Sequence, residues 1–252
     1  MPDAPHTQRS SSSRRRRPAW AAGAPAVLGG VALLAASCQF AAMEASYGVR
    51  FVLDGQTWTP LSVASVDEAL SSLPPEVRAS LGNPALGPLH LLSNETGTDL
   101  TGWSPYGRAA NYYSNHRGYN EIVLYPNQTA STVLHEMGHA YQLRSVPPGR
   151  IAWVFLDPEF LDFMEATEWR LESSPDEVAA AFEAYQVRFS YHGAPVWSGL
   201  SSFDPLEDYA NTFAQFFLDP EALRTLSPER YEWMASHLPG VQPDTAFALT
   251  GG

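Results

Sequence analysis

The chain has 252 residues, and its 27 acidic residues outnumber its 15 basic residues, giving a formal net charge of −12 at pH 7. The acids are scattered rather than gathered in blocks, which is typical of a solvated acidic exterior. Such a surface repels nucleic acid and anionic membranes, so we expect neither as a binding partner of the folded domain. The length beyond a leader segment is enough for one domain with its own core.

Residues 1–38 predict an export signal. A basic start, "SSSRRRRPAW", is followed by the apolar run "AAGAPAVLGGVALLAA" and by small residues that end at the only cysteine, Cys38. A membrane-spanning helix is the alternative, but alanine, glycine and proline make the run only weakly apolar. Because the cysteine is alone, the exported domain has no internal disulfide.

The stretch "LLAASC" resembles the end of bacterial lipoprotein signals, although Ala35 stands where those signals usually carry leucine. The resemblance implies lipidation of Cys38. The protein would then leave a bacterial-type cell as an envelope lipoprotein or, without the lipid, as a secreted protein. Membrane contact is expected only through this anchor or through an uncleaved signal.

The segment after the leader predicts a strand, two short helices and a second strand. "YGVRFVLDG" and "PLHLLSN" have the composition of strands, and "SVDEALSSLPPEVRASL" between them reads as two helical pieces broken at Pro74 and Pro75. Residues 94–118 lack a steady period and predict a long loop with one strand near residues 110–114. "NEIVLYPN" then predicts another strand that ends at Pro126.

Helices are expected to dominate the rest of the chain. "TVLHEMGHAYQ" predicts a helix that is capped by Thr129 or Ser131 and ends before Pro147. Residues 159–172 and 174–189 read as two amphipathic helices.

The end of the chain begins with a loop over residues 190–203 and has two more helices. Each opens on an acidic or serine residue followed by proline: "DPLEDYANTFAQFFLD" and "SPERYEWMASHL". Residues 241–252 read as a flexible tail. The fold class expected for residues 39–240 is therefore α+β, with a small mixed sheet near the N-terminus and a mainly helical C-terminal lobe.

"TVLHEMGHAYQ" also holds the pattern His-Glu-x-x-His. Residues four apart lie one turn above each other on a helix, so His135 and His139 can place two imidazole nitrogens on one ion. Glu136 can reach a water bound to the same metal and take its proton as the water attacks a carbonyl. The pattern therefore predicts half of a hydrolytic zinc site.

The alternative is an ordinary helix that carries two histidines. The context favours the metal site, because apolar residues surround the pattern and a predicted strand precedes it. Gly138 would also let another backbone come close to the metal face.

"VLHEMGHAYQ" resembles the active-site helix of the zincin metallopeptidases. The resemblance implies a zincin-like fold in which His135 and His139 bind Zn²⁺, Glu136 is the general base and a third ligand comes from elsewhere. The residues after His139, "AYQLRSVPPG", lack the third histidine of the metzincin branch. The third ligand is therefore expected downstream.

"DPLEDYANTFAQFF" resembles the second zinc helix of the gluzincin branch, most closely the lethal-factor and Mlc-titration-factor-like peptidases. The resemblance implies that Glu207 is the third zinc ligand, with Asp208 as its rival. Taken alone, Asp204 and Glu207 also fit a helix-capping arrangement in which Glu207 reaches back to a free amide.

Asn211 lies one turn after Glu207, where the family more often has an acid that orients a ligand histidine, and its amide oxygen can accept the same imidazole N–H. Related enzymes often carry a tyrosine that hydrogen-bonds the oxyanion, and Leu200 occupies roughly that place. The substitutes are Tyr191, His192 and Tyr209, none of which is assigned.

Zincins hold an extended peptide against an edge strand beside the first zinc helix, which makes Glu121–Tyr125 the candidate strand; a buried strand without an edge role is the alternative. Loop aromatics could line substrate pockets, although packing is their default role: Trp103, Tyr106, Tyr112 and Tyr113. His90 and His116 are expected to be structural.

The leading hypothesis is an exported, monomeric zinc metallopeptidase that acts on a peptide or protein substrate. A non-catalytic zinc-binding surface lipoprotein with the same fold is the first alternative, and hydrolysis of a non-peptide amide or ester is the second.

Overall fold

A computed structural model describes most of the chain beyond the leader, namely residues 38–54, 58–94, 110–116, 118–125, 128–194, 196 and 204–241. The chain divides into two compact units, Met1–Gln39 and Phe40–Gly252, and the fold described here is that of the second. The predicted export signal lies outside the described residues except for Cys38, which is exposed, and so do residues 242–252 of the predicted tail. Within the described part, no helix has the length and apolar character needed to cross a membrane.

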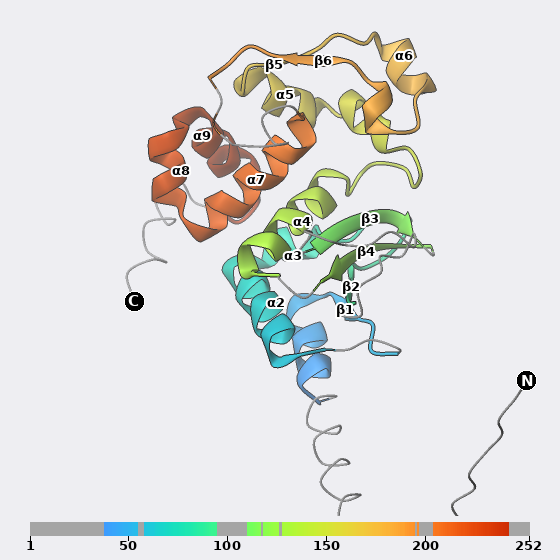
Figure 1. Ribbon diagram of the computed structural model, residues 1–252, viewed down its shortest axis with the longest axis vertical. Coiled ribbons are helices and arrows are strands. Elements are labelled where there is room, and N and C mark those ends of the chain that lie inside the picture. The colour runs from blue at the N-terminus through green and yellow to red at the C-terminus, as the bar shows by residue number, and fades with distance from the viewer. Residues whose placement is uncertain are drawn as a thin grey trace, which may run out of the picture. The chain divides into compact units, whose positions relative to one another are not determined.

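A four-stranded mixed sheet forms the N-terminal side of the domain (Figure 1). Its order is β1-β2-β4-β3, with β1 (Arg50–Phe51), β2 (His90–Ser93) and β4 (Tyr119–Leu124) parallel and β3 (Ala110–His116) antiparallel to β4. The predicted mixed sheet and its strands are thus confirmed.

The prediction that Glu121–Tyr125 forms an edge strand is wrong. β4 lies between β2 and β3, and its residues 120–124 are buried on both faces of the sheet, with Ile122 in the main core and Val123 in a second cluster. The alternative, a buried strand without an edge role, is the one that the structure supports. The sequence pattern of a strand does not tell a central strand from an edge strand, because pairing partners are set by tertiary structure. Among the described strands, β3 lies at the edge on this side of the sheet.

Two helices connect β1 to β2, as predicted. α2 (Pro60–Ser72) begins earlier than expected because Thr59 and Ser62 form a reciprocal capping box and Pro60 fits the first helical turn. α2 ends before Pro74, and α3 (Pro75–Ala79) follows.

α4 (Ala130–Gln142) is the helix that carries both histidines. The side-chain oxygen of Thr129 accepts a hydrogen bond from the backbone N–H of Thr132, so Thr129 rather than Ser131 is the N-cap. α4 packs against α2, against the sheet and against α7 (Pro205–Leu218), which is capped by Asp204. It therefore lies between the sheet and the helical lobe (Figure 1).

The prediction of two long helices over residues 159–189 is wrong in part. The segment forms α5 (Pro158–Ala166), β5 (Trp169–Leu171), α6 (Pro175–Ala180) and β6 (Phe189–Tyr191), with the 3₁₀ turns η1 (Ile151–Leu156) and η2 (Ala184–Gln186). Glu168 has a φ of 65°, in the left-handed region, and it follows the end of α5. β5 then pairs antiparallel with β6, so tertiary pairing overrides the helical period of the sequence.

The last two helices, α8 (Pro220–Leu226) and α9 (Pro228–His237), pack on each other and on α7. α8 was not anticipated, although Asp219-Pro220 repeats the opening of α7 and could have indicated it. Buried side chains from the four-stranded sheet, from α2 to α4 and from α5 to α9 form one hydrophobic core. The described domain is thus α+β, as expected.

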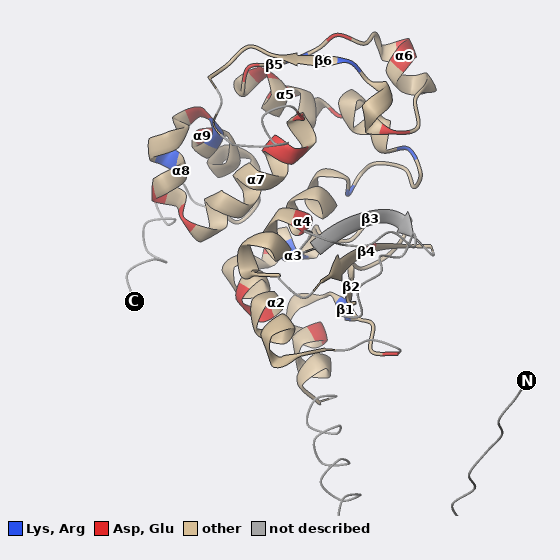
Figure 2. Cartoon of the chain, in the orientation of Figure 1, with Lys and Arg blue, Asp and Glu red and all other residues tan. Residues whose placement is uncertain are grey.

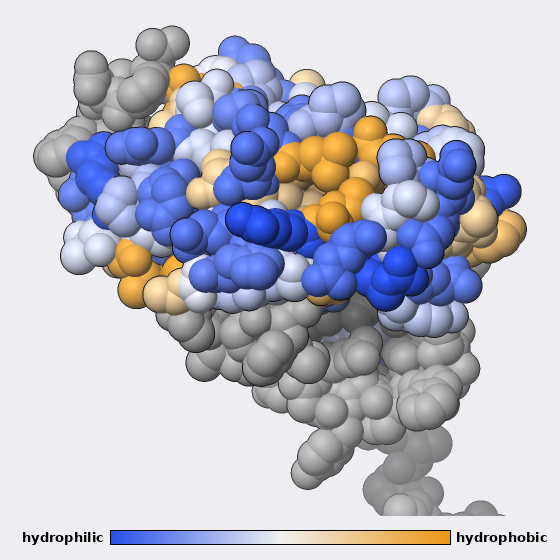
Figure 3. Space-filling model, turned by 90° about the horizontal axis from the view of Figure 1, so that it is seen from above, coloured by the Kyte–Doolittle hydropathy of each residue, from blue (hydrophilic) through white to orange (hydrophobic). Residues whose placement is uncertain are grey.

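Charged residues are spread over the described elements rather than gathered in one block, as the sequence indicated (Figure 2). The face seen in Figure 3 is mostly hydrophilic around an apolar area.

Candidate metal centre

Three side chains that can bind a metal converge between α4 and α7. Nε2 of His135 lies 3.3 Å from Oε2 of Glu207, and Nε2 of His139 lies 3.5 Å from Oε1 of the same residue. One ligand atom from each of the three residues lies within 4.8 Å of the others. The structure therefore brings together both histidines of the motif and the glutamate 68 residues farther along (207 − 139).

Close packing of the two helices makes this convergence possible. A Cβ atom added to Gly138 would lie 2.9 Å from Cα and 3.3 Å from the carbonyl oxygen of Ala210. Any side chain at residue 138 would therefore push α4 and α7 apart. Glycine is required here by the short distance between two backbones.

The spacing of the three groups fits zinc. Zinc binds imidazole nitrogen and carboxylate oxygen at about 2.0–2.2 Å, so two ligand atoms of a tetrahedral ion lie about 3.4 Å apart. The two nitrogen–oxygen distances, 3.3 Å and 3.5 Å, are close to that value. Two imidazoles and one carboxylate are also a ligand set of catalytic zinc, which leaves a fourth position for water or substrate.

Asn211 supports His135 from the other side of the ring. Its Oδ1 lies 2.9 Å from Nδ1 of His135. Because an amide oxygen can only accept, Nδ1 carries a proton and donates it, which leaves Nε2 as the atom that faces Glu207. Nε2 can donate to the Glu207 carboxylate when the ring is protonated, and it can offer its lone pair to a metal when the ring is neutral. The predicted orienting contact of Asn211 is present.

The charges of these groups reinforce one another in the metal-free protein. Hydrogen bonds from His135 and His139 hold the pKa of the Glu207 carboxyl far below its ordinary value. Burial alone would lower the pKa of His139, but the hydrogen bond to Glu207 and the charge of Glu136 outweigh it and raise that pKa. The centre thus stabilises positive charge between its ligands, and a metal cation carries such a charge.

Glu136 lies on α4 directly after His135 and is buried, with 8% of its surface exposed. Its negative charge is felt at His139. A carboxylate that is shielded from bulk water beside two histidines that could bind a metal is a candidate general base.

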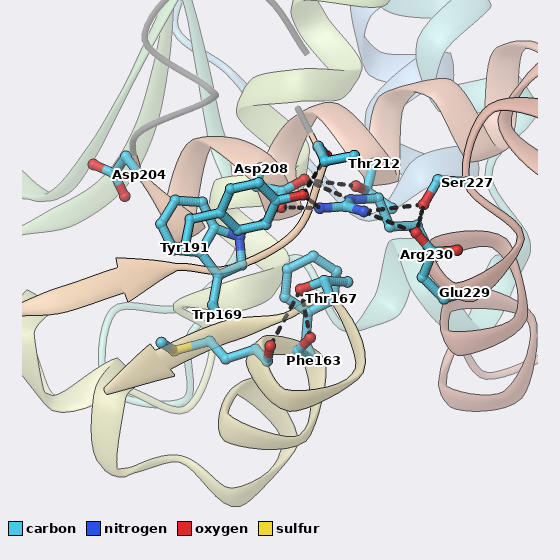
Figure 4. Close-up of polar contacts among 12 residues, drawn as sticks. Phe163, Thr167, Trp169, Tyr191, Asp204, Asp208, Thr212, Ser227, Glu229 and Arg230 are labelled. Carbon is cyan, nitrogen blue, oxygen red and sulfur yellow. Dashed lines mark hydrogen bonds and ion pairs between the residues drawn. The ribbon is translucent and has the colours of Figure 1, made fainter. Parts of the chain in front are cut away.

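Asp208, the rival ligand, is directed elsewhere. Its carboxylate accepts hydrogen bonds from Arg230 and from the indole of Trp169, at 2.7 Å each (Figure 4). The capping role also belongs to another residue, since the Asp204 carboxylate accepts from the backbone N–H of Leu206. Of the acids at the start of α7, the structure thus directs Glu207 toward the histidines.

The candidates for oxyanion stabilisation are engaged in other contacts. The hydroxyl of Tyr191 donates to the carbonyl of Ala194 at 2.6 Å, and Nε2 of His192 lies 3.0 Å from the hydroxyl of Ser190. Tyr209 is buried among aromatic rings, with its ring centroid 4.9 Å from that of Phe163.

The other predicted residues are either structural or undescribed. His90 stacks on Tyr119 with ring centroids 4.1 Å apart, as expected of a structural histidine. Leu200, Trp103 and Tyr106 lie outside the described residues, as do three side chains on β3: Tyr112, Tyr113 and His116.

Arg230 contacts the candidate metal centre through Asp208, and the sequence analysis did not predict any role for it. It lies on α9 with 2% of its surface exposed, and it contacts the acid next to Glu207. Nothing in its spacing from the metal ligands marks it out. Its neighbours Tyr231 and Trp233 indicate a helix with a buried face, but they do not show that an arginine belongs to that face.

Comparison of the chain with models of known protein families gives no match, and comparison with curated proteins gives none either. The function must therefore be inferred from the arrangement of the residues themselves.

Proposed function

We propose that the protein is a zinc-dependent metallopeptidase with a zincin-like fold of the gluzincin type. The observation that carries the proposal is the convergence of His135 and His139 with Glu207. A purely structural zinc prefers four protein ligands and does not need a buried carboxylate beside two of them. Three ligands and a neighbouring base instead match the requirements of hydrolysis.

Each residue has a distinct task in this proposal. His135, His139 and Glu207 would hold Zn²⁺, and Asn211 would keep the ring of His135 in the tautomer that binds metal. Zinc held by these residues would supply a water molecule with a pKa of about 7 and a Lewis acid for the substrate carbonyl. Glu136 accepts the proton of the attacking water and returns it to the leaving amine.

The edge strand supports a peptide as the substrate. β3 contacts α4 and pairs with β4 on one side only, within the described part of the chain. An extended peptide could add to its other side through main-chain hydrogen bonds, which would bring the peptide beside the metal helix. This strand replaces Glu121–Tyr125 in the role that the sequence suggested.

The decisive experiment compares Glu136→Gln with the unchanged protein. Glutamine has nearly the same size but cannot accept the proton, so zinc content should persist while cleavage of a mixed peptide library is lost. Glu165→Gln, on the exposed side of α5, is the matched control and should cleave normally. Undiminished cleavage by Glu136→Gln would refute the general-base role.

A second candidate function is zinc binding without catalysis, as in a surface lipoprotein. Two observations favour it: asparagine replaces the usual acid at residue 211, and Tyr191 and His192 make other contacts. The unchanged protein separates the two functions, because a non-catalytic protein would hold zinc and cleave neither peptides nor simple amides and esters. Cleavage of the amides or esters alone would indicate a non-peptide substrate.

Export, a lipid anchor at Cys38 and a monomeric state belong to the same proposal. They predict a lipid-modified or secreted protein outside the cytoplasm. Mass spectrometry of the N-terminal peptide tests the lipid, and size-exclusion chromatography with light scattering tests the monomer.

A further inference from the structure

A buried ion pair lies directly behind the third proposed ligand. Arg230 on α9 binds Asp208 on α7 through two hydrogen bonds: Nε to Oδ1 at 2.9 Å and Nη2 to Oδ2 at 2.7 Å (Figure 4). The side chains of both residues are 2% exposed. This two-pronged geometry is the strongest and most directional form of contact between arginine and a carboxylate.

Further hydrogen bonds hold the pair in place. The indole of Trp169 on β5 donates to Oδ2 of Asp208 at 2.7 Å, and Nη1 of Arg230 donates to the hydroxyl of Ser227 at 3.0 Å. Figure 4 shows the guanidinium between Asp208 on one side and Ser227 with Glu229 on the other. The pair thus connects α7 to α9 and to the β5-β6 ribbon.

Stability alone does not explain such a pair. Removing two charges from water costs about as much as their attraction returns, and apolar replacements of similar volume are often as stable. A fixed buried pair contributes geometry instead, because it is satisfied in only one arrangement of the two helices.

The buried pair bears on the orientation of the Glu207 side chain. Glu207 and Asp208 are consecutive, so their side chains leave the first part of α7 about 100° apart around the helix axis. When the guanidinium fixes Asp208, it also fixes the rotation and axial position of this part of the helix. The Glu207 oxygens then meet both histidines, at 3.3 Å and 3.5 Å.

Charge adds a second effect. Without Arg230, the Asp208 carboxylate would lose the guanidinium that balances its charge, although it would keep the hydrogen bond from Trp169, and it would add net negative charge next to Glu207. The guanidinium neutralises it and keeps it engaged on the other side.

We propose that Arg230, acting through Asp208, is a positioning residue that sets the orientation of Glu207 and thereby the metal affinity of the centre. This inference rests on the proposed function, since it takes Glu207 to be a zinc ligand. Arg230 itself touches neither metal nor substrate.

The test measures the Kd for Zn²⁺ by competition with a chromophoric chelator, and it records the visible spectrum of the Co²⁺ form as a readout of coordination. Arg230→Met keeps the apolar stem and removes the guanidinium. We expect its Kd to weaken about 10- to 100-fold, the range found when groups that orient metal ligands are lost. Its Co²⁺ spectrum should change, and Arg230→Lys should restore part of the affinity because it retains the charge without the fork.

Two further variants separate positioning from stability. Leu223→Ala opens a cavity in α8 without touching the pair, and it should lower the melting temperature but keep the Kd and the Co²⁺ spectrum. The double variant Asp208→Leu with Arg230→Met replaces the pair by apolar side chains, which tends to preserve folding, so it serves if Arg230→Met alone does not fold. It should still bind zinc more weakly.

The outcomes distinguish this inference from the proposed function. If the unchanged protein holds no zinc, both are overturned. If it holds zinc but folded Arg230→Met or the double variant keeps the same Kd and Co²⁺ spectrum, the positioning role alone is overturned. An equal loss of affinity in Leu223→Ala would also overturn it, because the effect would then follow general stability.

Discussion

Asn211 and Glu207 lie one turn apart on α7, and both contact the α4 histidines: Oδ1 of Asn211 is 2.9 Å from Nδ1 of His135, on the opposite side of the ring from Glu207. A single helix thus presents a proposed ligand and the group that orients another ligand. Any movement of α7 would therefore change both the Glu207 and the Asn211 contacts of the proposed metal site.

Asn211→Leu is expected to weaken zinc binding about 10-fold or more, because His135 loses the acceptor that fixes its ring and tautomer. Asn211→Asp should bind zinc more tightly, since a charged acceptor raises the basicity of the imidazole. Chelator competition measures both. Gln215→Leu, one turn farther along α7, is the control, since the Gln215 amide instead contacts the carbonyl of Asp219. A zinc affinity equal to that of the unchanged protein in all three variants would contradict the role of Asn211 in orienting His135.

Gly138→Ala should destabilise the protein although alanine is the better helix former. The higher helix propensity of alanine would add about 1 kcal/mol to the stability of α4. The new methyl group, however, would lie only 2.9 Å from the backbone of Ala210. Overpacking of this kind costs about 1–3 kcal/mol, and it would move α7 away from the histidines. Urea denaturation gives the free energy of unfolding, and zinc titration gives the affinity. Ser131→Ala, at an exposed position of α4, should change neither by much. A more stable Gly138→Ala protein with unchanged zinc affinity would show that the helices have room to spare.

Glu207→Ala should abolish most of the stabilisation that zinc gives to the folded protein. A ligand at 1,000 times its Kd adds about 4 kcal/mol to stability, so the unchanged protein should melt at a much higher temperature with zinc than with a chelator. In Glu207→Ala, the difference between the melting temperatures with zinc and with a chelator should be small. Asp204→Ala provides the comparison, because it removes the true N-cap of α7 and should lower both melting temperatures together. A full zinc effect in Glu207→Ala would exclude Glu207 as a ligand.

The Tyr209 hydroxyl is expected to bind an ordered water molecule. It is buried and has no hydrogen-bond partner among the described residues, and it lines a small polar cavity with Gln142 and Arg144. Burial raises its pKa well above the ordinary value, so the hydroxyl keeps its proton and can donate. Tyr209→Phe should then cost about 1 kcal/mol, the usual worth of a hydrogen bond. A gain in stability, measured by urea denaturation, would mean that the hydroxyl is unsatisfied in the native protein.

Local signals predicted the elements that carry the metal centre. Thr129 caps α4, and Asp204 with Pro205 opens α7, so both helices begin where short-range hydrogen bonds favour them. The histidine spacing could likewise be interpreted on one helix, because it depends only on helix geometry. The sequence predicted neither the left-handed Glu168 that precedes β5 nor the central place of β4, since both depend on strands distant in the chain.

The orientation of α7 also depends on tertiary structure. Glu207 and Asp208 are both acids on the first turn of α7. The sequence analysis chose Glu207 as the zinc ligand only because of the resemblance to the gluzincin branch. The structure directs them differently because Arg230, 22 residues after Asp208, is buried against one of them. Charged residues are mostly exposed, and tertiary packing decides which of them a fold buries. The local sequence pattern does not predict that choice.

Because the three proposed ligands come from two helices that lie far apart in the chain, the candidate metal centre is complete only when α7 packs against α4. α4 can pack on α2 and the sheet as soon as the first part of the domain has formed, but α7 must still dock onto Gly138. Until then the chain offers two imidazoles and no third ligand, so it would hold zinc weakly. If the protein is the hydrolase proposed above, a growing or partly unfolded chain would therefore be inactive until α7 has docked.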